Sequence, residues 1–170
     1  MSQGLLDALP DEFVTSIEGL TLRLLEPGDA DACWALVQAN RGHLTRHGDF
    51  TEQVGASRDE VRAAFEGPPD PFERAYGIRL HGELVGQISL IAANPPHYGL
   101  GCWLAESATG KGYARAACEA LFEQARTVLA ATDIFAGVTH GNTSSVALVR
   151  RLGFTPVAAF DTYTRFQKSL

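Results

Sequence analysis

The chain is poor in cysteine and has no excess of positive charge. Its 170 residues include three cysteines, Cys33, Cys102 and Cys118, which are too few and too scattered for a disulfide framework or a zinc site. We therefore expect free thiols and a reducing, cytoplasmic location. Fourteen Lys and Arg stand against twenty Asp and Glu, giving a formal net charge of -6. Because non-specific nucleic-acid binding requires a basic surface, this balance argues against a nucleic-acid partner.

Long apolar runs are also missing. No run approaches the roughly 20 residues that a membrane-spanning helix needs, so no membrane partner is expected. The segment from Met1 to Pro10 lacks the basic start and the apolar stretch of a signal peptide. The composition is that of an ordinary globular protein, and the length suits one domain. We predict a single domain over residues 1–170, with residues 1–18 as a leader that contains one helical turn.

Strand and helix patterns alternate along the rest of the chain. Alternating apolar residues predict strands over residues 20–25, 76–80, 84–90, 98–104, 134–139, 154–157 and 163–166. Apolar residues at steps of three and four predict helices after Asp29 as N-cap and over residues 58–65, 112–129 and 142–152, with a loop and a short helix over residues 40–57. The dipeptide His81-Gly82 suits a type I′ hairpin turn. Together these elements predict a mixed α/β sheet.

The segment from Leu104 to Ala114, LAESATGKGYA, predicts a phosphate cradle. A strand ends, a glycine-containing loop follows and a long helix begins, so unpaired N–H groups and a partial positive charge face the loop. The segment is not a Walker A loop, because Ala105 and Gly112 stand where that motif needs Gly and Ser or Thr. The dinucleotide fingerprint fails as well. A glycine-rich turn that only starts a helix explains the segment equally well when it is taken alone.

A second segment, from Asn142 to Phe154, follows the next strand. It reads NTSSVALVRRLGF, with an Asn-x-x-Ser helix start, Asn142 or Thr143 as the N-cap, and a Leu-Gly-Phe end. Together with the glycine loop about thirty residues upstream, it resembles the GNAT N-acetyltransferases, and in particular their RimJ/RimL-type branch of ribosomal-protein N-terminal acetyltransferases. The resemblance covers nearly the whole chain, including residues 20–30, 40–45 and 100–104.

The resemblance implies a single-domain α/β GNAT fold. Its sheet is mixed and mostly antiparallel, flanked by about four helices, with a central V-shaped splay between two parallel strands at residues 100–105 and 134–139. Acetyl-CoA is then the cosubstrate, with no metal; its pantetheine arm lies in the V and its pyrophosphate on the N–H groups of residues 109–114. The cofactor-binding residues expected on this basis are Trp103, Leu104, Ala105, Thr109, Gly110, Lys111, Gly112, Tyr113, Ala114, Asn142 and Ser145.

Several positions depart from the family pattern, and they limit the expected catalytic residues. Val149 stands where many relatives have a tyrosine acid, whereas Ser145 resembles the serine that this branch places near the thioester sulfur. A backbone N–H near Trp103 or Leu104 is the expected oxyanion donor. The strand over residues 97–104 has no glutamate. His140 is therefore the candidate base, with a solvated loop histidine as its alternative interpretation.

We thus expect an acetyl-CoA-dependent N-acetyltransferase that modifies a primary amine. The acceptor is a protein N-terminal α-amine or a small-molecule amine, and the sequence does not decide between them. The alternative is an acyl-CoA-binding sensor that has lost catalysis: the missing tyrosine and glutamate favour it, while Ser145 and the intact Gly110–Ala114 segment oppose it. His43 and His47 are further histidines in the polar loop, for which surface positions are the simpler interpretation. The general base, a homodimeric assembly and a preference for longer acyl groups stay open.

Overall fold

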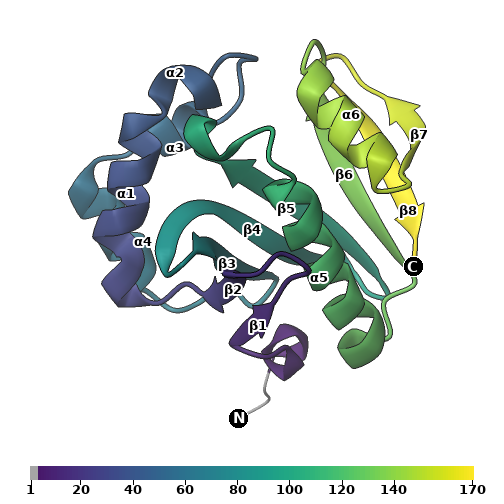
Figure 1. The fold of residues 1–170 in the computed structure, drawn as a ribbon, viewed down its shortest axis with the longest axis horizontal. Helices are drawn as coiled ribbons and strands as arrows, with labels where there is room; N and C mark the ends of the chain where they lie inside the picture. The colour runs from purple at the N-terminus through teal and green to yellow at the C-terminus, as the bar shows by residue number, and fades with distance from the viewer. Residues whose placement is uncertain (1–3) are drawn as a thin grey trace.

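The computed structural model describes residues 4–170 and contains one eight-stranded sheet in the order β1-β2-β3-β4-β5-β6-β8-β7 (Figure 1). Every neighbouring pair is antiparallel except β5 and β6, which run parallel. The mixed, mostly antiparallel α/β sheet is therefore confirmed. The strands are β1 (Glu12–Val14), β2 (Leu20–Leu24), β3 (Glu73–Leu80), β4 (Glu83–Asn94), β5 (His97–Leu104), β6 (Asp133–Thr139), β7 (Thr155–Ala159) and β8 (Tyr163–Ser169).

Four longer helices and two short ones flank the sheet. In Figure 1, α1 to α4 gather beside β2 to β4, α5 crosses the middle of the sheet, and α6 lies next to β6. The helices are α1 (Ala30–Ala39), α2 (Arg41–Leu44), α3 (Thr51–Gly55), α4 (Arg58–Glu66), α5 (Tyr113–Leu129) and α6 (Thr143–Arg151). Within residues 4–170, no helix is long and apolar enough to cross a membrane.

The parallel strands β5 and β6 separate after three pairs of residues. His97 faces Asp133, Tyr98 faces Ile134 and Gly99 faces Phe135, and the pairing ends there. Beyond Gly99 the two strands diverge, which opens a V between the α2 region and α6 (Figure 1). The predicted splay is therefore present, and it leaves one edge of β5 without a partner strand from Leu100 onward.

The hairpin of β3 and β4 has the predicted turn. His81 and Gly82 both have positive φ, 50° and 84°, as a type I′ turn requires. The alternating residues Tyr76, Ile78, Ile88 and Leu90 are fully buried. The hairpin is thus fixed in register by its turn and by its apolar face, and it supports β5 along one edge.

Helix α5 is amphipathic, as its sequence period predicts. Its buried residues are Ala116, Ala117, Cys118, Leu121, Phe122 and Ala125, and they pack in the single core cluster with the sheet. Burial of this stripe stabilises a helix of 17 residues in one orientation. Its N-terminus consequently points at the opening between β5 and β6 (Figure 1).

The segment that was expected to be a leader over residues 1–18 also contributes a strand to the sheet. It contains the helical turn, at Leu5–Ala8, but it also contributes β1, which pairs with β2. Leu6 and Leu9 are only 3% and 2% exposed. Arg74 reaches across from β3 and donates to the Asp11 carboxylate at 2.6 Å. The segment from residue 4 onward is therefore part of the core, and the expectation for residues 1–3 lies outside the described residues.

Asp29 is the N-cap residue of α1, as predicted, but its side chain makes no capping hydrogen bond. Its carboxylate accepts from the Glu26 N–H at 2.9 Å and pairs with Arg79 of β3 at 2.9 Å, with both side chains largely buried. The buried guanidinium of Arg79 requires an acidic partner. Because Asp29 and Arg79 are fifty positions apart, the sequence around Asp29 does not reveal this ion pair.

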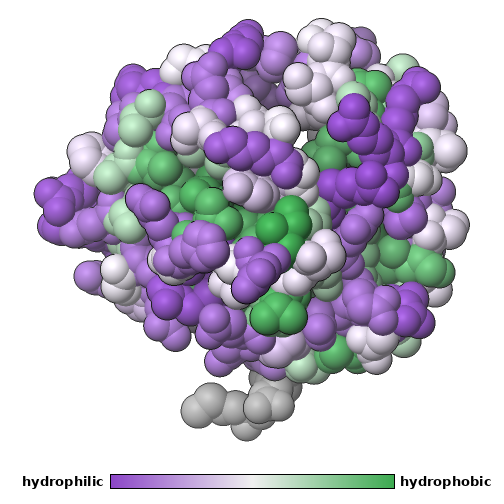
Figure 2. Space-filling view, viewed as in Figure 1, coloured by the Kyte–Doolittle hydropathy of each residue, from purple (hydrophilic) through white to green (hydrophobic). Residues whose placement is uncertain are grey.

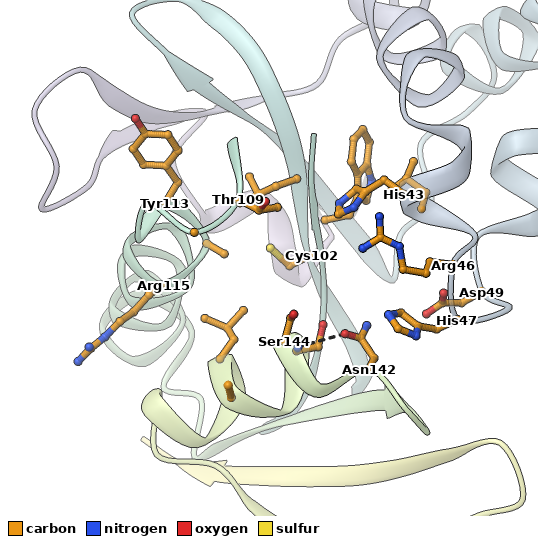
Figure 3. A pocket seen from close by; sticks show the side chains of 18 of the residues that line it. His43, Arg46, His47, Asp49, Cys102, Thr109, Tyr113, Arg115, Asn142 and Ser144 are labelled. Atoms are coloured by element: carbon orange, nitrogen blue, oxygen red, sulfur yellow. Dashed lines mark hydrogen bonds between the residues drawn. The ribbon is translucent and has the colours of Figure 1, made fainter. Parts of the chain in front are cut away.

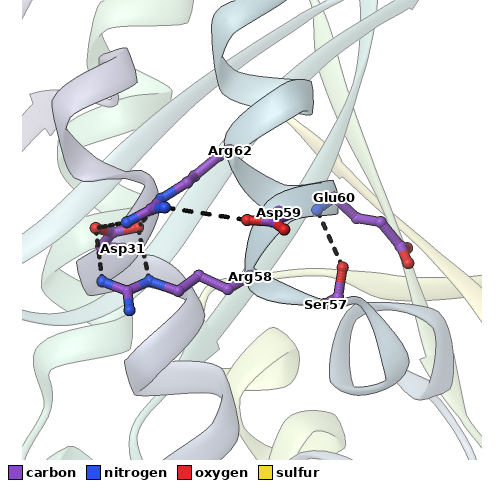
Figure 4. A network of polar contacts seen from close by, with 6 residues as sticks. All are labelled: Asp31, Ser57, Arg58, Asp59, Glu60 and Arg62. Carbon is purple, nitrogen blue, oxygen red and sulfur yellow. Dashed lines mark hydrogen bonds and ion pairs between the residues drawn. The ribbon is translucent and has the colours of Figure 1, made fainter.

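A second set of ion pairs fastens α4 to α1 (Figure 4). Asp31 of α1 accepts from Arg62 at 2.7 Å and from Arg58 at 2.9 Å, both on α4. Hydrogen bonds from Arg62 and Arg58 hold the pKa of the Asp31 carboxyl well below its usual range. Ser57 caps α4 by accepting from the Glu60 N–H at 3.1 Å. The segment between α1 and α4 is therefore anchored at both of its ends.

Candidate functional site

A cavity of about 740 Å³ fills the opening between β5 and β6. In the space-filling view the surface is hollowed between the α2 region and α6 (Figure 2), and Figure 3 shows the side chains that line the hollow. The lining has two halves. One consists of the start of α5 and residues along α6, and the other of the segment from His43 to Phe50, with Cys102 and Trp103 of β5 between them.

The start of α5 carries free N–H groups, which are the groups that an anion can bind. Gly110 and Gly112 have φ values of 74° and 83°, and a Cβ at either position would meet no atom within 4 Å. Only glycine adopts this backbone without strain, and the missing side chains leave the N–H groups accessible. The N–H groups of residues 110–115 donate to no other group within residues 4–170, whereas that of Thr109 donates to the Glu106 carbonyl at 3.1 Å. The free N–H groups therefore belong to residues 110–115, whereas the Thr109 N–H of the expected site is already used within the chain.

Asn142 caps α6, which decides between the two predicted N-caps. Its side-chain oxygen accepts from the Ser145 N–H at 3.2 Å. The residue follows β6 directly, through Gly141 in a left-handed conformation with φ of 88°. Because the cap holds α6 at the end of β6, it also places Ser144 and Ser145 on the cavity wall (Figure 3).

The unpaired edge of β5 presents specific backbone groups to the cavity. The Ala105 N–H donates to the Val85 carbonyl of β4 at 2.8 Å. Trp103 lies two residues earlier on β5 and pairs with Gln87 of β4. Backbone direction alternates along an antiparallel strand, so the Trp103 N–H also points to β4. The N–H groups of Cys102 and Leu104 then point into the V. Of the two predicted oxyanion donors, only Leu104 has the required direction.

Most of the predicted cofactor-binding residues line this one cavity. Those in the lining are Trp103, Leu104, Thr109, Gly110, Gly112, Tyr113, Ala114, Asn142 and Ser145. Ala105 is buried beside the cavity, and Lys111 is exposed on the loop; neither is part of the wall. His140 is also outside the lining, and its Nε2 lies 2.7 Å from the Phe160 carbonyl oxygen. The structure thus gives the predicted base another partner.

The segment from His43 to Phe50 contributes more of the cavity wall than the sequence predicted. Its lining side chains are His43, Leu44, Arg46, His47, Asp49 and Phe50. Thr139 at the end of β6 donates to Asp49 at 3.0 Å, and Asn40 accepts from the Glu106 N–H at 2.9 Å. These bonds tie the segment to both arms of the V. Two arginines of the other half, Arg115 and Arg151, also line the cavity and were not predicted as site residues. For Arg115, a cationic side chain three residues after Gly112 was the available signal.

The three cysteines are free thiols, as expected. Burial raises the pKa of Cys33 to about 11. A hydrogen bond with Cys102, together with burial, raises the pKa of Cys118 well above its usual range. Both thiols therefore stay protonated at neutral pH and act as packing residues, while Cys102 is the cysteine that lines the cavity.

These features define a class of protein. A parallel pair of strands that separates in the middle of a sheet accepts an extended chain as a further strand, and the free N–H groups at the start of α5 accept its phosphates. Such a site fits a long ligand that combines an amide-containing arm with a pyrophosphate, as an acyl-CoA does.

The chain belongs to the GNAT acetyltransferase family, since the model of the acetyltransferase (GNAT) domain matches residues 19–155. It is therefore an acyltransferase that uses acetyl-CoA. YdaF of Bacillus subtilis (strain 168), provisionally named a ribosomal N-acetyltransferase, is 32% identical over 147 residues, which cover 81% of this chain and 78% of YdaF. This relative supports the RimJ/RimL-type branch within the family.

Two solved structures share the fold. RimL, described as a ribosomal L7/L12 α-N-protein acetyltransferase in complex with coenzyme A, superposes with a TM-score of 0.80 at 22% identity, covering 95% of this chain and 97% of RimL. RimJ of Mycobacterium smegmatis, in complex with a CoA disulfide, gives a TM-score of 0.74 at 22% identity, covering 88% and 81% of the two chains.

Proposed function

We propose that this protein transfers an acetyl group from acetyl-CoA to the α-amine of a peptide N-terminus or of a small molecule. The observation that carries the proposal is the shape of the site. The cradle at residues 110–115 and the polar segment at residues 43–50 form opposite halves of one cavity and meet at Cys102 and Trp103 of β5. A thioester held from one half would then meet an amine entering from the other.

The residues of the cavity match the demands of thioester aminolysis. The N–H groups of residues 110–115 would bind the pyrophosphate. The Leu104 N–H would stabilise the negative charge that develops on the thioester oxygen, and Ser145 would hydrogen-bond the departing sulfur. The N-terminus of α6, where Ser145 lies, also favours negative charge.

The lack of a carboxylate on the central strand β5 supports an α-amine as the acceptor. A lysine-type amine with a pKa near 10.4 is almost fully charged at neutral pH, whereas an α-amine near 8 loses its proton far more easily. Strand β5 offers no carboxylate over residues 97–104. With His140 held at Phe160, we assign it no proton transfer in this proposal, and water takes the proton. A cytoplasmic location, where acetyl-CoA is made, completes the proposal.

The test is a panel of amines with the purified protein and acetyl-CoA. Peptides with free N-termini, N-blocked peptides that contain lysine, free amino acids and polyamines are compared by thiol release and by mass spectrometry of the products. We expect acetylation of α-amines and little transfer to lysine side chains. Calorimetric binding of CoA without turnover on any member of the panel would instead support the sensor alternative.

A further inference from the structure

His43 has an unusual environment within the cavity wall. The residue lies on α2 and lines the half of the cavity opposite the cradle (Figure 3). Its Nδ1 atom is sealed from solvent and has no hydrogen-bond partner within residues 4–170. Among the described residues, Arg79 Nε is the only other side-chain nitrogen or oxygen that is sealed from solvent and has no hydrogen-bond partner. A buried polar atom without a partner calls for a functional or structural reason.

The sealed nitrogen determines where the ring proton lies. A buried N–H without an acceptor destabilises the folded protein, and such orphaned donors are rarer in proteins than unpaired acceptors. In the neutral imidazole the proton therefore belongs on Nε2, and Nδ1 keeps its lone pair. His43 lines the cavity and its Nε2 is not among the sealed atoms, so the ring presents an N–H donor to the cavity, rather than the lone pair that a general base needs.

The helix that carries His43 is also held in place relative to the V. Asn40, immediately before α2, binds the Glu106 N–H at 2.9 Å, and the Leu44 N–H donates back to the Asn40 carbonyl at 2.9 Å. Arg46 pairs with Glu106 at 3.2 Å. These contacts join α2 to the end of β5. The donor of His43 thus has a defined position beside the place where the amine enters.

We infer that the His43 Nε2–H donates a hydrogen bond to an oxygen of the acceptor that lies next to the amine, such as the first carbonyl of a peptide. This inference rests on the proposed function and names a specificity-determining residue for it. The thioester oxygen already has the Leu104 N–H, and His43 lies on the opposite side of the cavity from the cradle. An acceptor without such an oxygen leaves the donor unpaired and is disfavoured.

The kinetic test compares two small acceptors of similar amine basicity, glycinamide, which has the oxygen, and propargylamine, which lacks it. His43→Phe removes the donor, and His43→Gln keeps an N–H donor. We expect the Phe variant to lose about tenfold or more in kcat/KM on glycinamide with little change on propargylamine, and the Gln variant to retain most of the preference. His81→Asn, in the hairpin turn outside the cavity, is the control and should change neither rate. Equal losses on both acceptors would overturn the inference.

A second measurement needs no turnover. Nitrogen-15 chemical shifts of the His43 ring, recorded in the complex with CoA, report which nitrogen carries the proton. We expect protonated Nε2 and unprotonated Nδ1, with a change at Nε2 on adding glycinamide and none with propargylamine. A proton on Nδ1 would overturn the inference. Failure of the wild-type protein to acetylate any amine, with the expected ring shifts present, would count against the proposed function alone.

Discussion

At the scale of single residues, the position of Ser145 bears most directly on the proposed reaction. Its backbone N–H is used by the Asn142 cap, and its side chain belongs to the cavity wall. Val149, one turn further along α6, is buried at 4% exposure and cannot supply a proton. A serine is a poor acid, so its expected contribution is orientation of the sulfur and hydrogen bonding, with water completing the proton transfer.

Replacing Ser145 by alanine should therefore slow the reaction without weakening CoA binding. We expect turnover to fall by about ten- to a hundredfold, equivalent to about 1.4–3 kcal/mol of barrier, because the hydrogen bond forms only as the thiolate leaves. Ser107→Ala, on the loop before the cradle and outside the cavity wall, is the matched control. Steady-state rates on the acceptor found by the amine panel, with calorimetry for CoA, decide the question. Full activity of Ser145→Ala would remove the residue from the mechanism.

At the scale of elements, the loop between β5 and α5 and the loop between β6 and α6 carry the site. Each loop follows one arm of the V and begins a helix, so two helix N-termini converge on the same cavity. The arrangement follows from local sequence: glycines with positive φ in the first loop and an asparagine cap in the second. Both loops can be tested by single substitutions.

Gly112→Asp should abolish tight CoA binding. The substitution introduces a side chain and a negative charge into the empty space next to the free N–H groups of the cradle. Gly82→Asp is the control, because Gly82 also has φ near 84° and open space around it but lies in the β3–β4 turn. The two variants carry similar backbone strain, so calorimetry separates loss of the site from loss of stability. Unchanged CoA affinity in folded Gly112→Asp would contradict the cradle.

Asn142→Ala should lower both the melting temperature and the affinity for CoA. Loss of a helix cap typically costs about 1 kcal/mol of stability, and here the cap also holds the start of α6 against the cavity. Ser57→Ala removes the cap of α4, which is remote from the cavity, and should lower stability alone. If Asn142→Ala left CoA affinity at the wild-type value, the cap would be structural only.

At the scale of the whole molecule, the N-terminal segment is part of the hydrophobic core and of the sheet. Leu6 and Leu9 pack in the same core cluster as α5 and the central strands, and β1 completes one edge of the sheet. The layer that supports the site therefore includes residues from the first turn of the described chain, far in sequence from the cradle.

Leu9→Ala should destabilise the whole domain. Leu9 is 2% exposed whereas Leu5, in the same turn, is 49% exposed, so Leu5→Ala is a closely matched control. Truncating a buried leucine costs about 2–5 kcal/mol, and an exposed one far less. We expect urea unfolding to show a clear loss for Leu9→Ala and almost none for Leu5→Ala. Equal stabilities would mean that the segment only rests on the surface.

The sequence by itself determined the features that depend on neighbours along the chain. The period of α5, the positive-φ turn at His81-Gly82, the glycine loop at Gly110 and Gly112 and the asparagine cap of α6 all follow from propensities and spacings within a few residues. The same local patterns identified the family and most residues of the cavity half that contains the start of α5 and α6.

Only the tertiary structure decided the features that depend on register and on distant partners. The Asp29 side chain pairs with Arg79 of β3, His140 lies against Phe160, and β1 joins the sheet. The pairing of β5 with β4 selects Leu104 over Trp103 as the N–H that faces the V. The half of the cavity formed by residues 43–50 has the same origin: bonds such as Thr139 to Asp49, 90 residues apart, bring this segment to the cavity, and no local pattern encodes a contact over that distance.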